Sequence, residues 1–151
     1  MFTYAYDKAF GIAVTLFSGA TNTDDDYAGF IDLIQKLDAL GAGRDQPVFF
    51  QIFDAENPPF PAIWRKRVVE VRSSLKSKPL VLVLAQSRLY ASIIWVVNKL
   101  DPPPFEQYNV STFEEGVELV NARRPGTGPI LQALHAEARS AVTSGAAGRP
   151  V

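Results

Sequence analysis

The chain has 151 residues, a length that suits a single domain with a core large enough to fold without disulfides or metals. Hydrophobic residues make up 47% of it and charged residues 21%, which is typical of globular proteins, and the formal net charge is only -1. Such a balance provides no overall field to attract nucleic acid or an anionic membrane. The absence of cysteine excludes thiol catalysis, disulfides and thiolate metal sites, and the single histidine excludes a histidine-rich metal cluster.

The composition also bears on location. A chain without cysteine suits a reducing compartment. The first residues do not combine a basic segment with a long apolar run, so we expect no secretory signal. The longest apolar segments are far shorter than the roughly 18 residues that span a bilayer. We therefore expect a cytoplasmic protein without a membrane partner.

The start of the chain predicts an antiparallel hairpin. Aromatic and small residues alternate over residues 2–6, residues 11–17 form a second apolar strand, and residues 7–9 lie between them as a tight reversal. Thr23 is then a suitable N-cap for a helix over residues 24–40, in which apolar residues recur at helical spacing.

The run of six apolar residues at 80–85 is the strongest structural signal in the sequence. It predicts a strand buried on both faces, as in a parallel sheet covered by helices. An earlier strand is predicted at 47–53, and a basic helix follows from about Pro61. Ser87 is a candidate N-cap for a third helix at 88–100.

The last part of the chain predicts a short strand over residues 105–110, a helix with acids in its first turn, and then a Gly/Pro-rich linker at 123–129. An amphipathic tail helix follows, and the C-terminal end is predicted to be disordered. The sequence therefore predicts an α/β fold in the order β-β-α-β-α-β-α-β-α, with a mixed, mostly parallel sheet of four or five strands. We assign residues 1–122 to this domain and residues 123–151 to the linker, the tail helix and the disordered end.

This order of elements resembles the STAS-like fold of anti-sigma-factor antagonists and their SpoIIAA-like relatives. The segment 110–119 strengthens the resemblance, because a strand passes there through a Ser or Thr cap into an acidic, apolar helix. The resemblance covers residues 2–122 and implies a protein-binding module, often switched by phosphorylation of a serine after the third strand. In this chain the corresponding turn, 54–58, keeps the aspartate and lacks that serine. Glu56 is positioned to place a fixed negative charge near the following helix N-terminus.

No catalytic motif is present. The Gly-rich segments 41–44 and 126–128 lack a phosphate-loop lysine, and neither Ser18 nor Ser87 lies in a nucleophile elbow. Three acids at 24–26 fit a magnesium site, although the first turn of a helix explains them more simply. We predict no metal and no cofactor, and we favour a protein that is not an enzyme.

The predicted helix at 88–100 has apolar residues around more than one face, so a second surface is expected to pack against it. That surface belongs to a dimer, to another partner or to the tail helix. If the tail helix competes with a partner there, deletion of the residues after Arg124 will increase partner binding. The basic helix before it also favours an acidic partner, whereas we do not expect nucleic acid to bind. The candidate partner-binding residues are Trp64, Arg65, Tyr90, Ile94 and Trp95.

Two functions remain open at this point. The leading interpretation is a non-catalytic protein-interaction or regulatory module of STAS-like type, which binds a protein partner or forms a homodimer. The alternative is a small-molecule-binding domain or a hydrolase without a recognisable motif, with its site at the carboxyl ends of the strands, where open α/β sheets bind ligands. The candidate ligand or switch-loop residues are Asp54, Glu56, Ser87 and Arg88.

Overall fold

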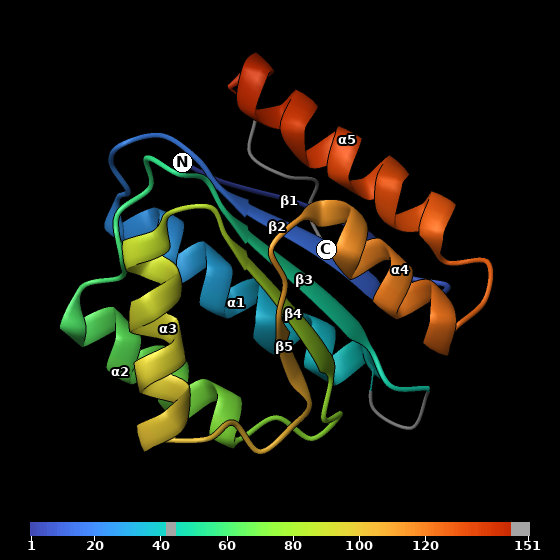
Figure 1. The fold of residues 1–151 in the computed structure, drawn as a ribbon, viewed down its shortest axis with the longest axis horizontal. Coiled ribbons are helices and arrows are strands. Elements are labelled where there is room, and N and C mark those ends of the chain that lie inside the picture. The colour runs from blue at the N-terminus through green and yellow to red at the C-terminus, as the bar shows by residue number, and fades with distance from the viewer. Residues whose placement is uncertain (42–44, 146–151) are drawn as a thin grey trace.

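A five-stranded mixed sheet forms the centre of the molecule in the computed structural model, which describes residues 1–41 and 45–145 (Figure 1). Its strands are β1 (Phe2–Asp7), β2 (Ile12–Phe17), β3 (Val48–Phe53), β4 (Leu80–Ala85) and β5 (Gln107–Asn109). The strands lie in sequence order across the sheet, with β1 antiparallel to β2 and every other neighbouring pair parallel. The predicted α/β fold, with its N-terminal hairpin and mostly parallel sheet, is confirmed.

Helices cover both faces of the sheet (Figure 1). The first face carries α1 (Asp24–Gly41), α2 (Ala62–Ser73) and α3 (Arg88–Leu100). Because right-handed crossovers that progress in one direction across a sheet place their helices on the same side, these three helices lie together. The second face carries α4 (Phe113–Arg123) and α5 (Gly128–Ser144). No helix in the described ranges is both long and apolar enough to cross a bilayer.

Two hydrophobic clusters, one on each face, account for the apolar sequences of the inner strands. In β3, Phe49 and Phe53 belong to the cluster beneath α1, α2 and α3, whereas Phe50 and Ile52 belong to the cluster beneath α4 and α5. Alternate residues of one strand therefore enter opposite layers. This arrangement explains why the inner strands have almost no polar positions, with Gln51 as the exception in β3.

The predicted helix starts are confirmed by their capping bonds. The Thr23 hydroxyl accepts a hydrogen bond from the Asp26 amide at 3.2 Å, and the Asp26 carboxylate accepts one from the Thr23 amide at 2.8 Å, which is a reciprocal capping arrangement. Ser87 Oγ accepts from the Tyr90 amide at 3.3 Å at the start of α3. Local side chains thus fix where α1 and α3 begin.

The predicted tail helix is present as α5, but it lies on the face of the sheet opposite to α3 (Figure 1). Leu131 and Leu134 are buried in the same cluster as the strands, and Thr3 Oγ1 of β1 donates a hydrogen bond to the Ala138 carbonyl at 3.0 Å. The expectation that this helix competes with a partner for α3 is therefore wrong, because α5 buries its apolar stripe elsewhere. The division of the chain at residue 122 stays a prediction. The disorder predicted for residues 144–151 does not hold for Ser144, which ends α5, and residues 146–151 lie outside the described residues.

Candidate functional site

The turn after β3 places the predicted switch residue Asp54 against α5. Its two carboxylate oxygens each accept a hydrogen bond from the Arg139 guanidinium, both at 2.7 Å, and its side chain is only 15% exposed. A ligand at Asp54 would have to compete with this bidentate ion pair, which is the strongest form of an arginine–carboxylate contact. The sequence analysis missed Arg139 because nothing in the local sequence links the two residues.

His135 extends the same cluster on the α4 and α5 side of the sheet. Its ring stacks on Phe113 with centroids 4.1 Å apart, and Arg139 Nε approaches His135 Nε2 at 3.4 Å. Burial lowers the pKa of His135, and the neighbouring Arg139 charge lowers it further. In the described part of the chain no hydroxyl is hydrogen-bonded to His135, so this imidazole is not paired with a hydroxyl nucleophile there.

The other predicted switch-loop residues lie at the same end of the sheet. The turns after β3 and β4 are adjacent, because the Gln86 amide donates to the Phe53 carbonyl at 3.0 Å. Glu56 and Arg88 are exposed, and Ser87 is used to cap α3. Within residues 1–41 and 45–145 no hydrogen bond or ion pair joins any two of the four predicted residues, so they share a region without forming one constellation.

Two of the three acids at the start of α1, Asp24 and Asp26, are held by protein groups. Asp24 Oδ1 accepts a hydrogen bond from Trp64 Nε1 at 2.9 Å, and Asp26 accepts from the Phe2 amide as well as from Thr23. Among the residues that the structure describes, no group of three or more histidine or carboxylate side chains could hold a metal ion.

Four apolar side chains of α3 are exposed to solvent. We call this group the α3 surface; it comprises Leu89, Trp95, Val96 and Leu100, which are 68%, 57%, 46% and 82% exposed. The spacing of Leu89, Val96 and Leu100 places them along one side of the helix. Tyr90 is the one residue of α3 that is fully buried. A helix with so little buried surface and so many exposed apolar side chains is unusual in a protein without a partner.

Two basic residues of α3 lie beside the α3 surface. Arg88 and Lys99 lie on α3 itself, and the Lys99 ammonium lies 5.3 Å from the centre of the Trp95 ring. The adjacent helix α2 exposes Arg65, Lys66 and Arg67. The one acid of α2, Glu70, forms an ion pair with Arg67 at 3.5 Å. Arg88 and Lys99 thus give the apolar strip a positively charged margin on one side.

The predicted partner-binding residues divide between the surface and the interior. Arg65 and Trp95 are exposed, whereas Tyr90 is buried and its ring packs edge-on against Phe53 at 4.8 Å. Ile94 also faces the core, and Trp64 stacks on the Tyr27 ring at 5.5 Å. The sequence predicts an interaction helix at α3, but the rotation of this helix about its own axis, which selects the outward residues, depends on tertiary packing.

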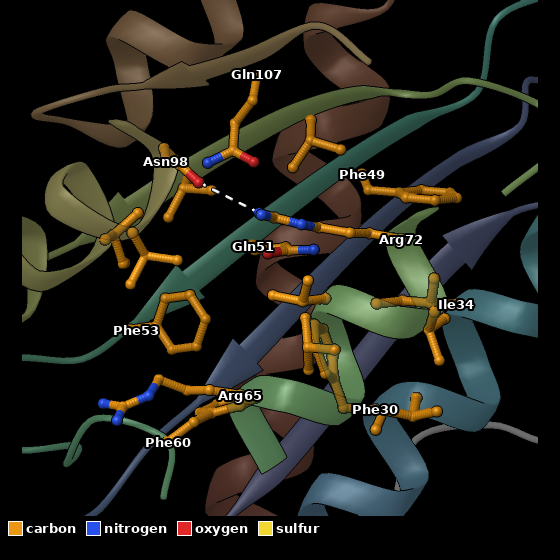
Figure 2. Close-up of a pocket in the computed structure, with 18 of the residues that line it drawn as sticks. Phe30, Ile34, Phe49, Gln51, Phe53, Phe60, Arg65, Arg72, Asn98 and Gln107 are labelled. Atoms are coloured by element: carbon orange, nitrogen blue, oxygen red, sulfur yellow. Dashed lines mark hydrogen bonds between the residues drawn. The ribbon is translucent and has the colours of Figure 1, made fainter. Parts of the chain in front are cut away.

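A cavity of about 130 Å³ lies beneath α3, between α2, α3 and the sheet (Figure 2). Its walls are mostly apolar and include Phe53, Val83 and Ile94. A few polar side chains also reach it, among them Gln51. The sequence analysis did not predict this cavity, because a cavity arises where side chains of distant segments fail to fill the space between them.

Comparison with known proteins adds no assignment. No protein-family model matches the chain, and no curated protein and no solved structure shows significant similarity to it. The features of the molecule that bear on function are the α3 surface, the cavity beneath it and the cluster around Asp54.

Proposed function

We propose that the chain is a non-catalytic binding module of STAS-like type, and that its α3 surface docks an acidic, amphipathic segment of a protein partner. The observation that carries this proposal is the exposure of Leu89, Trp95, Val96 and Leu100 on a single helix. Contiguous exposed apolar side chains with a polar margin mark interaction sites, and tryptophan is enriched among the residues that dominate binding energy.

The charges around the α3 surface favour an acidic partner over a second copy of the chain. Two copies paired through α3 would bring the Arg88 and Lys99 of one molecule close to those of the other. Like charges brought together in this way oppose association, whereas carboxylates of an acidic helix would complement them. An amphipathic helix supplies the apolar residues for the strip and the acids for its margin.

The topology supports the STAS-like part of the proposal. The hairpin, the parallel strands and the entry into α4 through the Thr112 cap agree with what the resemblance implies. A chain without cysteine also suits the cytoplasm, where such a module would meet its partner. The alternative hydrolase site near Asp54 has less support, because Arg139 occupies both oxygens of that carboxylate.

Site-specific photo-crosslinking tests the proposal. The photoreactive amino acid p-benzoylphenylalanine is placed at position 96 in the full chain, and in a control at position 10, because Val96 and Phe10 are almost equally exposed, at 46% and 47%. Phe10 lies in the β1–β2 turn, on another part of the surface. We expect a protein adduct from position 96 and none from position 10. The peptide of the partner that is crosslinked should be acidic and amphipathic.

The identified segment is then titrated as a synthetic peptide against the purified protein. We expect Trp95→Ala and Lys99→Glu to weaken binding at least tenfold, and added salt to weaken it further. A crosslinked homodimer, an adduct with nucleic acid or lipid, or equal labelling from positions 96 and 10 would each refute the proposal.

A further inference from the structure

We propose that the cavity beneath α3 binds a small neutral molecule, about the size of one aromatic ring, that carries a hydroxyl or amide group. This site is separate from the α3 surface, because the α3 surface faces solvent and the cavity lies on the inner side of the helix. The inference does not depend on a protein partner.

The size of the cavity sets the size of the ligand. A volume of about 130 Å³ is several times that of a water molecule and close to that of an apolar cavity known to hold benzene, at roughly 150 Å³. Its walls come from α1, α2, α3 and three strands, with aromatic and aliphatic side chains such as Phe49, Phe53 and Ile94. Apolar walls around such a space favour a ring or a short branched chain over water.

Gln51 supplies the polar contact. It is the one polar residue of β3 and lies between Phe49 and Phe53 on the face toward α1, α2 and α3, where its side chain borders the cavity. Its side-chain amide has no hydrogen bond to any residue within the described ranges, although the strand around it is buried. This amide is therefore open to the cavity, where it can both donate to and accept from a ligand hydroxyl or amide.

Two further polar groups lie near this part of the cavity. Thr15 pairs with Gln51 across the β2–β3 ladder, and its buried hydroxyl oxygen has no hydrogen-bond partner in the part of the chain that is described. Gln107 of β5 borders the cavity as well. Figure 2 shows the Gln51 and Gln107 amides toward the end of the pocket that contains the Arg72 guanidinium, with Phe53 and Phe60 toward the other end.

Two arginines border the cavity: Arg65, which is exposed, lies toward the end with Phe60, and Arg72 lies toward the end with the amides (Figure 2). The state of Arg72 favours a neutral ligand over a carboxylate at the amide end. Its guanidinium donates to Asn98 Oδ1 at 3.3 Å, the dashed bond in Figure 2, and to the Asp101 carbonyl at 2.6 Å, and the Asp101 carboxylate lies 3.6 Å away. The Arg72 charge is therefore already matched. An incoming carboxylate would lose its hydration and would have to displace Asp101, whereas the uncharged amides match a hydroxyl or amide directly.

Ligand-observed saturation-transfer NMR on the full chain tests the proposal with three ring compounds, benzyl alcohol, toluene and benzoate. We expect benzyl alcohol to bind at least tenfold more tightly than benzoate. Gln51→Met keeps a side chain of similar size without the amide, so it should weaken benzyl alcohol about tenfold and leave toluene unchanged. Ile94→Phe fills the cavity, so it should abolish the saturation-transfer signals of both benzyl alcohol and toluene.

Gln132→Met serves as the matched control, because Gln132 is exposed on α5 at the other face of the sheet. It should change none of the affinities, and thermal unfolding will verify that every variant is folded. Absence of saturation transfer from benzyl alcohol and toluene to the unmodified protein would overturn the proposal. Benzoate binding as tight as benzyl alcohol would overturn the neutral ligand class, and an unchanged benzyl alcohol affinity in Gln51→Met would overturn the assignment of Gln51.

Discussion

Asp54 and Arg139 join the carboxyl end of β3 to α5 through two hydrogen bonds of 2.7 Å, although 85 residues separate them in the sequence. The Asp54 side chain is 15% exposed and the Arg139 side chain 37%, so water screens the pair only in part. Its bidentate geometry fixes the orientation of both side chains. The turn that the STAS-like resemblance associates with phosphorylation is thus bound to the last helix of the chain.

This ion pair leads to a stability prediction. Arg139→Ala leaves the Asp54 carboxylate largely buried without its partner, so we expect the free energy of unfolding to fall by about 1–3 kcal/mol. Urea denaturation of the full chain measures it. Lys36→Ala is the control. Lys36 forms an ion pair with Asp32 in which both side chains are exposed, Asp32 at 61% and Lys36 at 53%, so this pair should contribute at most about 0.5 kcal/mol. Equal losses in the two variants would contradict a structural role for the Asp54 pair.

A second prediction concerns the close approach of α4 to the sheet. A Cβ atom at Gly116 would lie 2.5 Å from Cζ of Phe50, which is fully buried, so Gly116→Ala forces the ring or the helix to move. We expect a loss of about 1–3 kcal/mol in the free energy of unfolding. Gly29→Ala in α1 is the control, because its Cβ would lie 3.6 Å from Phe2 and alanine favours a helix by about 1 kcal/mol. Similar calorimetric midpoints for both variants would disprove the close contact.

The fold was largely predictable because its signals are local. The apolar run that became β4 and the caps Thr23 and Ser87 each act over a few residues, and they fixed the order, type and starts of the elements. The face covered by α5 was not predictable in the same way. Its periodic apolar residues, such as Leu131, show that one side is buried, but they do not show against which surface.

The candidate site was predicted less completely, because it depends on contacts between distant segments. The sequence selected α3 as a binding helix, yet Tyr90 and Ile94 turned out to face the core while Leu89 and Leu100 face solvent. The partner of Asp54 and the cavity beside Gln51 both require the packed structure. Such long-range arrangements leave no pattern in neighbouring residues.

The environment of His135 predicts a dependence of stability on pH. Burial, and then the Arg139 charge, lowers the pKa of His135 below its ordinary value of 6.5 in the folded protein. The unfolded chain therefore binds the proton more readily, so this contribution to stability is complete above about pH 6.5 and decreases as the pH falls toward the folded pKa. We expect the urea midpoint to decrease from pH 7.5 to pH 5.5.

A variant without the imidazole isolates this effect. Because His135→Gln removes the titrating group, its urea midpoint should change less than that of the unmodified protein over the same interval. Asp54 and Glu114 also act on His135 and both would raise its pKa, so the comparison is made with these residues unchanged. A parallel pH profile in the two proteins would show that His135 is not the source of the dependence.

The position of α5 reverses the expected effect of its removal. Because Leu131 is fully buried in the cluster with Val14 and Leu16 of β2, deletion of the residues after Arg124 should expose the sheet and prevent cooperative folding. Leu131→Ala should reduce the free energy of unfolding by about 2–5 kcal/mol, and Gln132→Ala on the exposed side of α5 by less than about 0.5 kcal/mol. Circular dichroism during urea denaturation tests all three variants. A shortened chain that still unfolds cooperatively would show that α5 is dispensable.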